Sequence, residues 1–525
     1  MKRLWPLMAA AVAAALILAG CGGTTRSPSG SADKTFVYAF HLNVVTEWDP
    51  AVSYSNESIA MGNLYESLTK YDATTKKVEP SLASSWTKSD DGKTWTFTLR
   101  DGVKFHTGRA LDSTAVKEAI ERTKKLAAGA AYIWDPVTKI DTPDPTTVVF
   151  SLEYPAALDL VASSGYGAYI YDTQAAGSGD LAAWFKEAKD AGTGPYTVDT
   201  WKAGAETELR LKAYDDYWGG WKDDQYKAVE FRVTPEVTTA WQLLQRGDVS
   251  FVDRLTPQIF EQAAKTDGVK TGETSSFQNL LALYNTESGP MADVRVRRAV
   301  QMLTDTDAII SALHGAAAPA DGLIPPGLIG EGKVGVQADA EAAKKLLAEA
   351  GFGSDKPLRL QLTYAQGDKD QSLYVTLLGS ALKAAGVELD ARPMQWDAQW
   401  TRAKSSDPAK RQDIFVMYWY PDYADPYSWF VNLFQSAEKP YFNLAYLHDP
   451  EADAAIKKVP EETATSPDQA AQTYLNLQKR IVVDDAAVTP LYLINYQRAY
   501  SAQVDGYVDN PAYPNVVFVH DLRIK

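Results

Sequence analysis

The chain has 525 residues and a formal net charge of −15 at pH 7. Its length is typical of about three domains or lobes. Hydrophobic residues (45%) and charged residues (23%) occur in the proportions of an ordinary globular protein. Such an acidic chain lacks the basic surface that nucleic acid requires, so nucleic acid is disfavoured as a partner.

The first residues of the chain have the layout of an export signal. A positive start (Lys2, Arg3) precedes an apolar stretch, and small residues then lead to Cys21. This arrangement predicts a signal peptide over residues 1–20. A membrane-spanning helix is disfavoured because the apolar stretch is short and Pro6 interrupts it.

Cys21 is the only cysteine in the sequence, which excludes an intramolecular disulfide and a cysteine metal cluster. The tetrapeptide Leu18-Ala19-Gly20-Cys21 resembles the lipobox of bacterial lipoproteins, which implies cleavage before the cysteine and lipidation of its thiol. Residues 21–34 carry no large apolar side chain, and we expect them to form a flexible tether. The expected location is therefore extracytoplasmic, with the protein anchored to the cell membrane through a lipidated Cys21.

From residue 35 onward, predicted strands and helices alternate. Alternating apolar and polar residues, or short apolar runs, predict strands at 35–40, 93–99, 146–152, 207–214, 357–364, 387–394, 413–420 and 488–496. Helical periodicity and end signals predict helices at 113–128, 293–313, 338–350, 370–386 and 467–484. Residues 228–253 fit a strand, a helix, a Gly-Asp turn and a second strand. Strands that alternate with helices indicate α/β lobes with mixed sheets.

Five stretches of the chain resemble the extracytoplasmic solute-binding proteins of family 5, which feed peptide and nickel ABC importers. The longest and most specific of them begins NLYESLTKYD and ends STAVKEAI. The stretches lie in the same order as in the family, at residues 63–120, 192–204, 293–310, 343–352 and 441–456.

The resemblance implies a two-lobed α/β fold of the periplasmic-binding-protein type (type II), with mixed sheets, a hinge and an inserted subdomain. Lobe one is expected to contain residues 35–63, 192–283 and 492–525, with the subdomain inserted at 64–191. Lobe two is expected at 284–491. The ligand is expected between the lobes, where closure buries it.

The function that this resemblance implies is that of a solute-binding lipoprotein. It would capture a peptide-like solute and deliver it to the permease subunits of an ABC importer, as a monomer, without a cofactor or catalytic residues. Two alternatives remain open at this point: an oligosaccharide or metal-chelate binder of the same family, and an anchored extracellular hydrolase. The hydrolase is disfavoured because the sequence contains no GxSxG elbow. No histidine pair has metal-ligand spacing, and the GxGxxG match at 330–335 follows a Pro-rich loop rather than a strand.

The candidate ligand site lies in residues 415–430, of which half are aromatic. In oligopeptide-binding relatives a W-x-x-D-Y motif follows the equivalent strand, and its aspartate binds the α-ammonium of the peptide. Trp419, Asp422 and Tyr423 occupy this motif, with Tyr420 inside it. A desolvated ammonium needs a carboxylate in direct contact, and aromatic walls exclude water from the pair. We prefer this role for Asp422 over that of a turn cap.

Two further residues complete the predicted site, Val45 after the first strand and Lys369 in lobe two. Dipeptide-binding relatives hold the ligand carboxylate with an arginine just after the first strand of lobe two. Residues 365–371 contain no arginine here, and Lys369 can substitute only as a point charge. Without such a substitute, longer peptides or a ligand without that carboxylate are favoured. Four other aromatic residues of the cluster are interpreted individually as lobe core: Tyr418, Tyr427, Trp429 and Phe430.

Overall fold

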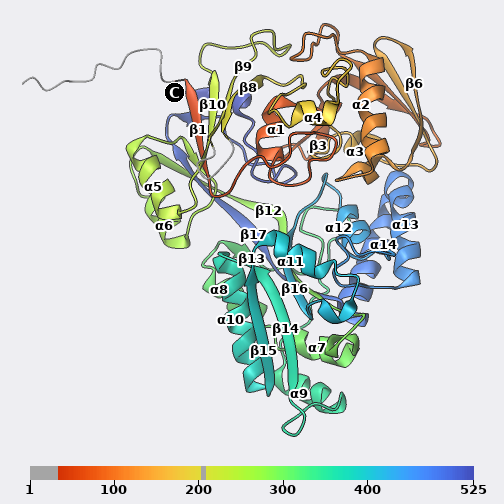
Figure 1. Cartoon of the computed structure of the whole chain (residues 1–525), viewed down its shortest axis with the longest axis vertical. Helices are drawn as coiled ribbons and strands as arrows, with labels where there is room; N and C mark the ends of the chain where they lie inside the picture. The colour runs from red at the N-terminus through yellow and green to blue at the C-terminus, as the bar shows by residue number, and fades with distance from the viewer. Residues whose placement is uncertain (1–33, 203–207) are drawn as a thin grey trace, which may run out of the picture.

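The computed structural model describes residues 34–202 and 208–525, which form two bodies joined by long strands (Figure 1). We call the body around β1 (Thr35–Phe40) lobe one and the body around β16 (Ile414–Trp419) lobe two. The predicted two-lobed α/β fold with mixed sheets is confirmed. The predicted signal peptide, Cys21 and nearly all of the predicted tether lie outside the described residues. In the part of the chain that the structure describes, no helix has the length and apolar character needed to cross a bilayer.

One eleven-stranded mixed sheet runs through both lobes, in the order β15-β14-β16-β12-β17-β11-β1-β10-β9-β8, with β13 paired to β17. The lobe-one strands of this sheet are β1, β8 (Tyr196–Lys202), β9 (Glu208–Ala213), β10 (Ala228–Val233) and β11 (Phe251–Val252). The lobe-two strands are β13 (Ala317–Ala318), β14 (Leu358–Ala365), β15 (Val387–Met394) and β16. Strands β14, β15 and β16 are parallel to one another.

Two long antiparallel strands, β12 (Val269–Tyr284) and β17 (Val488–Ser501), connect the lobes (Figure 1). The first half of β12 pairs only with β17, whereas the second half also pairs with β16 of lobe two. The β12–β17 register shifts between Ser275 and Asn279. Because irregular pairing allows a ladder to bend, we place the hinge at this shift. This register shift lies a few residues before the lobe boundary that we expect at 283/284. The domain boundaries given above remain predictions.

The region between β1 and β8 folds around its own four-stranded antiparallel sheet, β4-β5-β7-β6. Its strands and main helix are β4 (Ala83–Lys88), β5 (Thr94–Leu99), β6 (Val137–Asp144), β7 (Thr147–Leu152) and α2 (Ser113–Leu126). Trp95, Phe97 and Leu99 of β5 are buried as the alternation predicts. Asp112 caps α2 by accepting a hydrogen bond from the backbone N–H of Ala115 at 2.8 Å, as expected for this residue type.

The remaining elements of lobe one and the inserted region are short. They are α1 (Ser58–Leu64), β2 (Thr69–Asp72), β3 (Lys77–Pro80), α3 (Leu158–Val161), α4 (Leu181–Phe185), α5 (Val237–Arg246), α6 (Pro257–Ala263), β18 (Val504–Asp505) and β19 (Arg523–Ile524). Helices α5 and α6 cover lobe one on the side away from the inserted region (Figure 1).

The lobe-two helices pack on both faces of its part of the sheet. They are α7 (Val294–Met302), α8 (Thr306–Ala312), α9 (Ala340–Glu349), α10 (Lys369–Ala384), α11 (Trp396–Ala403), α12 (Tyr427–Leu433), α13 (Pro450–Thr465) and α14 (Pro467–Lys479). The single helix predicted at 293–313 is wrong, since the chain breaks it into α7 and α8. Asp305 caps the second helix by accepting from the N–H of Ala308 at 2.9 Å, and this local bond starts a new helix.

Candidate functional site

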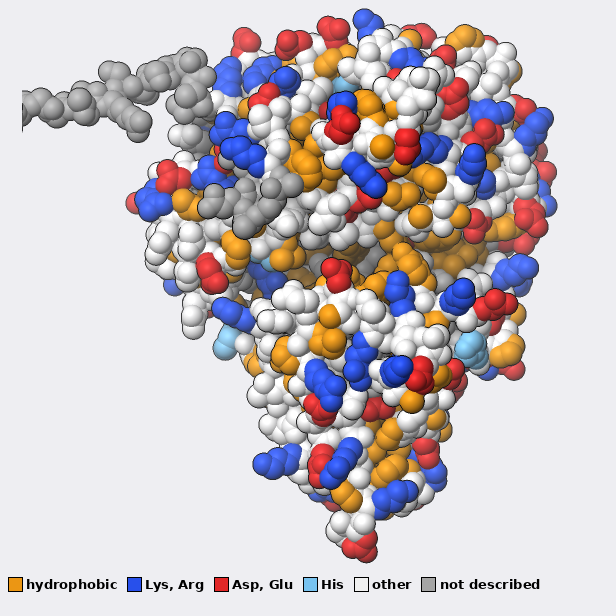
Figure 2. Space-filling model, in the orientation of Figure 1, with side chains coloured by type: hydrophobic (Ala, Val, Ile, Leu, Met, Phe, Trp, Pro, Cys, Tyr) orange, Lys and Arg blue, Asp and Glu red, His pale blue; other side chains and the backbone are white. Residues whose placement is uncertain are grey.

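The candidate site lies where β14 and β16 end. Residues that follow each strand contact lobe one: Asp370 after β14, and Tyr420 and Asp422 after β16. The carboxyl ends of these parallel strands therefore face lobe one, which is where open α/β sheets collect ligands. Figure 2 shows an indentation between the two lobes with hydrophobic side chains along it.

Side chains alternate along β16, as strand geometry requires. Phe415, Met417 and Trp419 point into the lobe-two core that α12, α13 and α14 help to form. The alternate, even-numbered positions lead past the end of the strand to Tyr420 and Asp422, whose side chains contact lobe one. Both faces of β16 are buried in lobe two, with Ile414 and Val416 in its second core, and only beyond the end of the strand does the chain reach lobe one.

Asp422 of lobe two accepts three hydrogen bonds from side chains of lobe one. Its side chain is 2% exposed, and its Oδ2 accepts hydrogen bonds from the hydroxyls of Tyr54, at 2.9 Å, and Tyr132, both in lobe one. Its main-chain oxygen accepts a third lobe-one bond, from Ser164 Oγ at 2.6 Å. Asn432 donates to the Tyr132 hydroxyl at 3.2 Å and orients it. The carboxylate is therefore enclosed between the two lobes.

Aromatic rings surround this carboxylate. The Tyr420 and Tyr166 rings stack across the cleft with centroids 6.3 Å apart, and their hydroxyls lie 3.4 Å from each other. The Tyr54 ring meets the edges of Tyr166, at 5.4 Å, and of Phe442, at 5.7 Å. Such rings exclude water and present negative faces to a cation.

The charge of Asp422 has no cationic partner among the described residues. Burial raises the pKa of Asp422 to about 6, and the hydroxyl bonds from Tyr132 and Tyr54 only partly oppose this rise. A buried carboxylate that must be charged is costly unless a cation joins it. The site is therefore suited to accept a positively charged group.

Asp425, the second acid of the aromatic cluster, has a different setting. It accepts from the N–H of Tyr427 at 2.8 Å and from the hydroxyl of Tyr474 at 3.0 Å, both in lobe two. Burial raises its pKa to about 6 as well. Both of these hydrogen bonds stay within lobe two, whereas those of Asp422 bridge the lobes.

Of the six site residues predicted from sequence, the structure brings Tyr420, Asp422 and Tyr423 together at the cleft and places the other three elsewhere. Tyr420 and Tyr423 pack against the lobe-one core, although both follow a lobe-two strand. Trp419 lies in the lobe-two core, where its Nε1 donates to Ser428 Oγ at 3.4 Å. Val45 is buried in the lobe-one core, and Lys369 is exposed at the start of α10. Neither Val45 nor Lys369 forms a hydrogen bond or an ion pair with Asp422 in the described part of the chain.

Sequence reasoning missed the lobe-one half of the site. Tyr54, Tyr132, Ser164 and Tyr166 lie far from the W-x-x-D-Y motif in the chain, and no local pattern marks them. Composition gives no signal either, because tyrosine is common throughout this chain and is itself favoured in strands.

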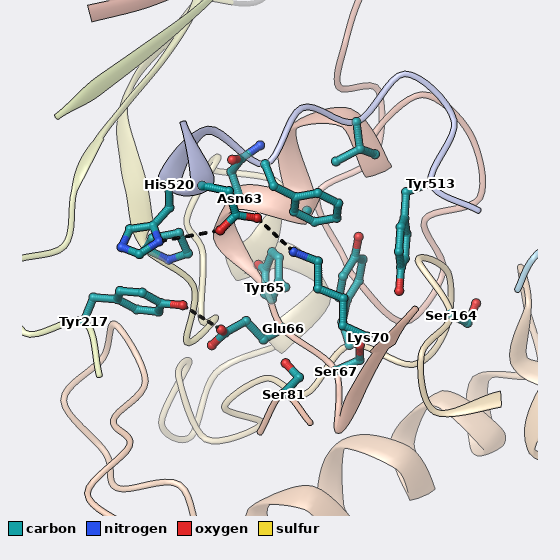
Figure 3. Close-up of a pocket in the computed structure, with 16 residues that line it drawn as sticks. Asn63, Tyr65, Glu66, Ser67, Lys70, Ser81, Ser164, Tyr217, Tyr513 and His520 are labelled. Carbon is teal, nitrogen blue, oxygen red and sulfur yellow. Dashed lines mark hydrogen bonds and ion pairs between the residues drawn. The ribbon is translucent and has the colours of Figure 1, made fainter. Parts of the chain in front are cut away.

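A separate small pocket, of about 80 Å³, lies within lobe one between α1, β2 and the C-terminal segment (Figure 3). Its charged groups are paired internally: Lys70 Nζ lies 3.2 Å from Asp521, and Glu66 accepts from Tyr217 at 3.0 Å and Trp218 at 2.8 Å. These pairs leave little for a ligand to bind. Across residues 34–202 and 208–525, no cluster of three or more His, Cys, Asp or Glu side chains has the arrangement of a metal site.

Comparison with known proteins agrees with this geometry. The profile of the bacterial extracellular solute-binding proteins, family 5 (middle), matches residues 77–441. The chain belongs to this family. It is 29% identical over 483 residues to the probable D,D-dipeptide-binding periplasmic protein of Escherichia coli (strain K12), covering 90% of this chain and 91% of that relative.

Solved structures show the same fold at lower identity. The oligopeptide-binding protein AppA of Bacillus subtilis, in complex with a nonapeptide, superposes with a TM-score of 0.80 at 22% identity, covering 94% of this chain and 99% of that one. NikA of Brucella suis, in complex with Fe(III)-EDTA, gives a TM-score of 0.80 at 22% identity, covering 94% and 100% of the two chains. These likenesses establish the two-lobed fold of this family 5 protein.

Proposed function

We propose that this family 5 protein binds a peptide-like solute between its lobes and delivers it to an ABC importer. The observation that carries the proposal is the buried Asp422 carboxylate, which is held by hydroxyls of the opposite lobe and has no cation beside it. The α-ammonium of a peptide would supply that cation. Relatives named as binders of D,D-dipeptides and dipeptides support the peptide class.

The Asp422 carboxylate can accept a ligand without losing its lobe-one partners. Both tyrosine hydroxyls donate to Oδ2, so a ligand ammonium can approach Oδ1 while Tyr54 and Tyr132 stay bonded. The Tyr420 and Tyr166 rings can then cover the ammonium. This proposal needs no reacting group, and the protein would act as a binding protein rather than an enzyme.

The decisive experiment compares a peptide with a free amine and the same peptide after N-acetylation, by calorimetry, on the native protein and on Asp422→Asn. Removing one partner of a buried ion pair costs on the order of 2–5 kcal/mol, or about thirtyfold to several thousandfold in affinity. Either change alone should produce this loss, and both together should cost less than their sum because they remove the same contact. Equal binding of free and acetylated peptides to the native protein would overturn the ammonium role.

An oligosaccharide ligand is the second candidate, favoured by an aromatic surface beside the cleft. Trp396 (46% exposed) stacks on Trp400 with centroids 5.5 Å apart, and Tyr441 (51% exposed) meets the Trp400 ring at 5.7 Å. Phe442 then connects this surface to Tyr54. Native mass spectrometry of the protein as purified would distinguish a retained peptide from a sugar by mass.

Anchoring to the membrane is part of the proposal and depends on Cys21. Cleavage before this residue and lipidation of its thiol would hold the folded body close to the outer face of the membrane. Cys21→Ser should move the protein from the membrane fraction to the soluble fraction. Unchanged membrane retention of that variant would reject the lipid anchor.

A further inference from the structure

An arginine of lobe one meets lobe two at the other end of the row of side chains that contains Asp422. Arg254, which follows β11, donates from Nη2 to Asp370 Oδ2 at 2.7 Å. Asp370 belongs to the 365–371 segment, which contains no arginine of its own. Beside this ion pair, the Tyr418 hydroxyl donates to Asp368 Oδ2 at 3.0 Å. The structure thus brings a guanidinium to this segment from across the cleft.

Tyr418 lies in β16, and Tyr420 and Asp422 are the next alternate residues, just after the strand ends; all three lie at the edge of lobe two that faces lobe one. Tyr418 donates to Asp368, two residues before the Asp370 that Arg254 binds, Tyr420 stacks on Tyr166, and Asp422 accepts from lobe-one hydroxyls. At about 3.3 Å per residue, Tyr418 and Asp422 are separated by roughly 13 Å along the segment. The Asp422 carboxylate and the Arg254 guanidinium therefore lie near opposite ends of a row that is roughly 13 Å long.

A zwitterionic peptide has the complementary charges, an ammonium at one end and a carboxylate at the other. We propose that Arg254 binds the C-terminal carboxylate of a peptide whose ammonium is held by Asp422, so that the cleft selects short peptides. An extended chain spans at most about 3.3–3.6 Å per residue, so a row of roughly 13 Å fits three or four residues. This inference rests on the proposed peptide-binding function.

The chemistry of Arg254 suits this role. A guanidinium carries five N–H donors in a planar fork that matches a carboxylate, and among the described residues Arg254 gives one of its donors to a single partner, Asp370. Its side chain is 38% exposed, so a ligand can reach the remaining donors. Partial burial is outweighed by Tyr418 and the nearby carboxylates Asp370, Asp368 and Asp253, which raise the pKa of Arg254 and keep it charged.

The competing interpretation is a latch, in which Arg254 and Asp370 merely hold the lobes together. A partly exposed ion pair contributes about 0–1 kcal/mol, and a latch would act equally on every ligand that requires closure. A carboxylate-binding arginine acts only on ligands with a free C-terminal carboxylate. The two roles are therefore separable by the chemistry of the ligand.

The test uses calorimetry with tetra-alanine and its C-terminal amide on the full-length folded protein and its variants. Arg254→Gln should lower the affinity for the free-acid peptide by about tenfold to a hundredfold, because it removes charge-assisted hydrogen bonds to the carboxylate. The affinity for the amide should change by less than about twofold. Arg246→Gln, which alters an exposed arginine of the same lobe, is the matched control and should change neither. Lys369→Gln tests the lysine suggested by the sequence and should also change neither.

Asp370→Asn separates the two roles further. It removes the carboxylate that competes for Arg254, so the free-acid peptide should bind at least as tightly as to the native protein. If Arg254→Gln and Asp370→Asn each lowered the affinity for the acid and for the amide equally, the ion pair would only hold the lobes together, and the proposal would be overturned. If only Lys369→Gln lowered the affinity for the free-acid peptide, Lys369 rather than Arg254 would bind the carboxylate, and the proposal would be overturned.

The length of the ligand gives an independent measurement. Peptides of two to six alanines should show the tightest binding at three or four residues, and an optimum at two or at six would overturn the length assignment.

Failure of the inference is distinguishable from failure of the proposed function. If the native protein binds no peptide at all, the proposed function fails. If it binds peptides without discriminating acid from amide, only the role of Arg254 fails.

Discussion

Tyr132 of lobe one donates a hydrogen bond to Asp422 of lobe two across 290 positions of sequence. The bond exists only when the lobes are closed, because the two residues lie on opposite sides of the cleft. Closure therefore buries a carboxylate together with hydroxyls that can share its charge but cannot neutralise it. A ligand that brings a positive charge would stabilise the closed arrangement more than an uncharged one, and this differential affinity is what drives such a change.

The affinity for an amine ligand should fall with decreasing pH. Burial raises the pKa of Asp422 to about 6, above the ordinary value of 3.8, whereas an ammonium binds only the charged carboxylate. Full affinity is then expected above pH 6 and is lost as the pH falls through 6, with binding at pH 5 about tenfold weaker than at pH 7. Calorimetry of a free-amine peptide from pH 5 to pH 8 measures this slope.

Asp422→Asn is the control for this pH profile, because it removes the titrating group and keeps an oxygen that can accept the tyrosine hydroxyls. Its weak residual affinity should be independent of pH over this range. A native profile that stays flat between pH 5 and pH 8 would show that Asp422 does not hold the ligand charge.

Tyr132→Phe should shift the pH profile rather than abolish binding. The Tyr132 hydroxyl lowers the pKa of Asp422 by donating to it, so its removal should raise that pKa further and move the midpoint of the affinity profile upward. The lost charge-assisted bond should also weaken peptide binding at pH 7 by roughly tenfold to a hundredfold. Tyr427→Phe is the matched control, since its ring lies 6.3 Å from that of Tyr132. Equal effects of both variants would indicate a packing role only.

Closure should be visible in solution. With saturating peptide, small-angle scattering should give a smaller radius of gyration, because the lobes approach one another about the hinge in β12 and β17. Peptide at about 100 times its dissociation constant should add roughly 2.7 kcal/mol to the free energy of unfolding and raise the melting temperature. Asp422→Asn at the same peptide concentration should show a smaller effect on both. A radius that does not change while calorimetry shows binding would contradict closure.

The fold and the lobe-two half of the candidate site were predictable from the sequence, and the reasons are local. The strand before Asp422 is an apolar run that ends at a W-x-x-D-Y motif, and both features are contiguous in the chain. The partners of Asp422 are not: Tyr54, Tyr132 and Ser164 lie 368, 290 and 258 positions away. Their arrival depends on how the inserted region packs on lobe two, which no short stretch of sequence encodes.

Arg254 illustrates the same limit in a different way. Its segment, FVDRL, fits a short strand followed by a loop, and nothing in it indicates a contact with Asp370, 116 positions later. The sequence analysis looked for a cation within 365–371 because dipeptide-binding relatives carry an arginine just after the first strand of lobe two. The structure supplies the cation from the opposite lobe, so the assignment requires the packing of the two lobes.

Replacing Asp425 by asparagine should stabilise the protein at neutral and alkaline pH. Burial raises the pKa of Asp425 to about 6, which means that the folded state favours the protonated form. The stability that this group contributes is complete below pH 4 and is lost as the pH rises through 6. Both recorded hydrogen bonds to its side chain, from Tyr427 and Tyr474, go to Oδ1, which asparagine retains. Asp425→Asn should therefore match the native stability near pH 4 and exceed it by roughly 1–3 kcal/mol at pH 8.

Urea unfolding at pH 4, 6 and 8 measures this difference. Asp267→Asn is an exposed control, and its stability should differ little from that of the native protein at any of the three pH values. If Asp425→Asn were less stable than the native protein by the same amount at every pH, the charge of Asp425 would carry no burial penalty, and its hydrogen bonds would be its whole contribution.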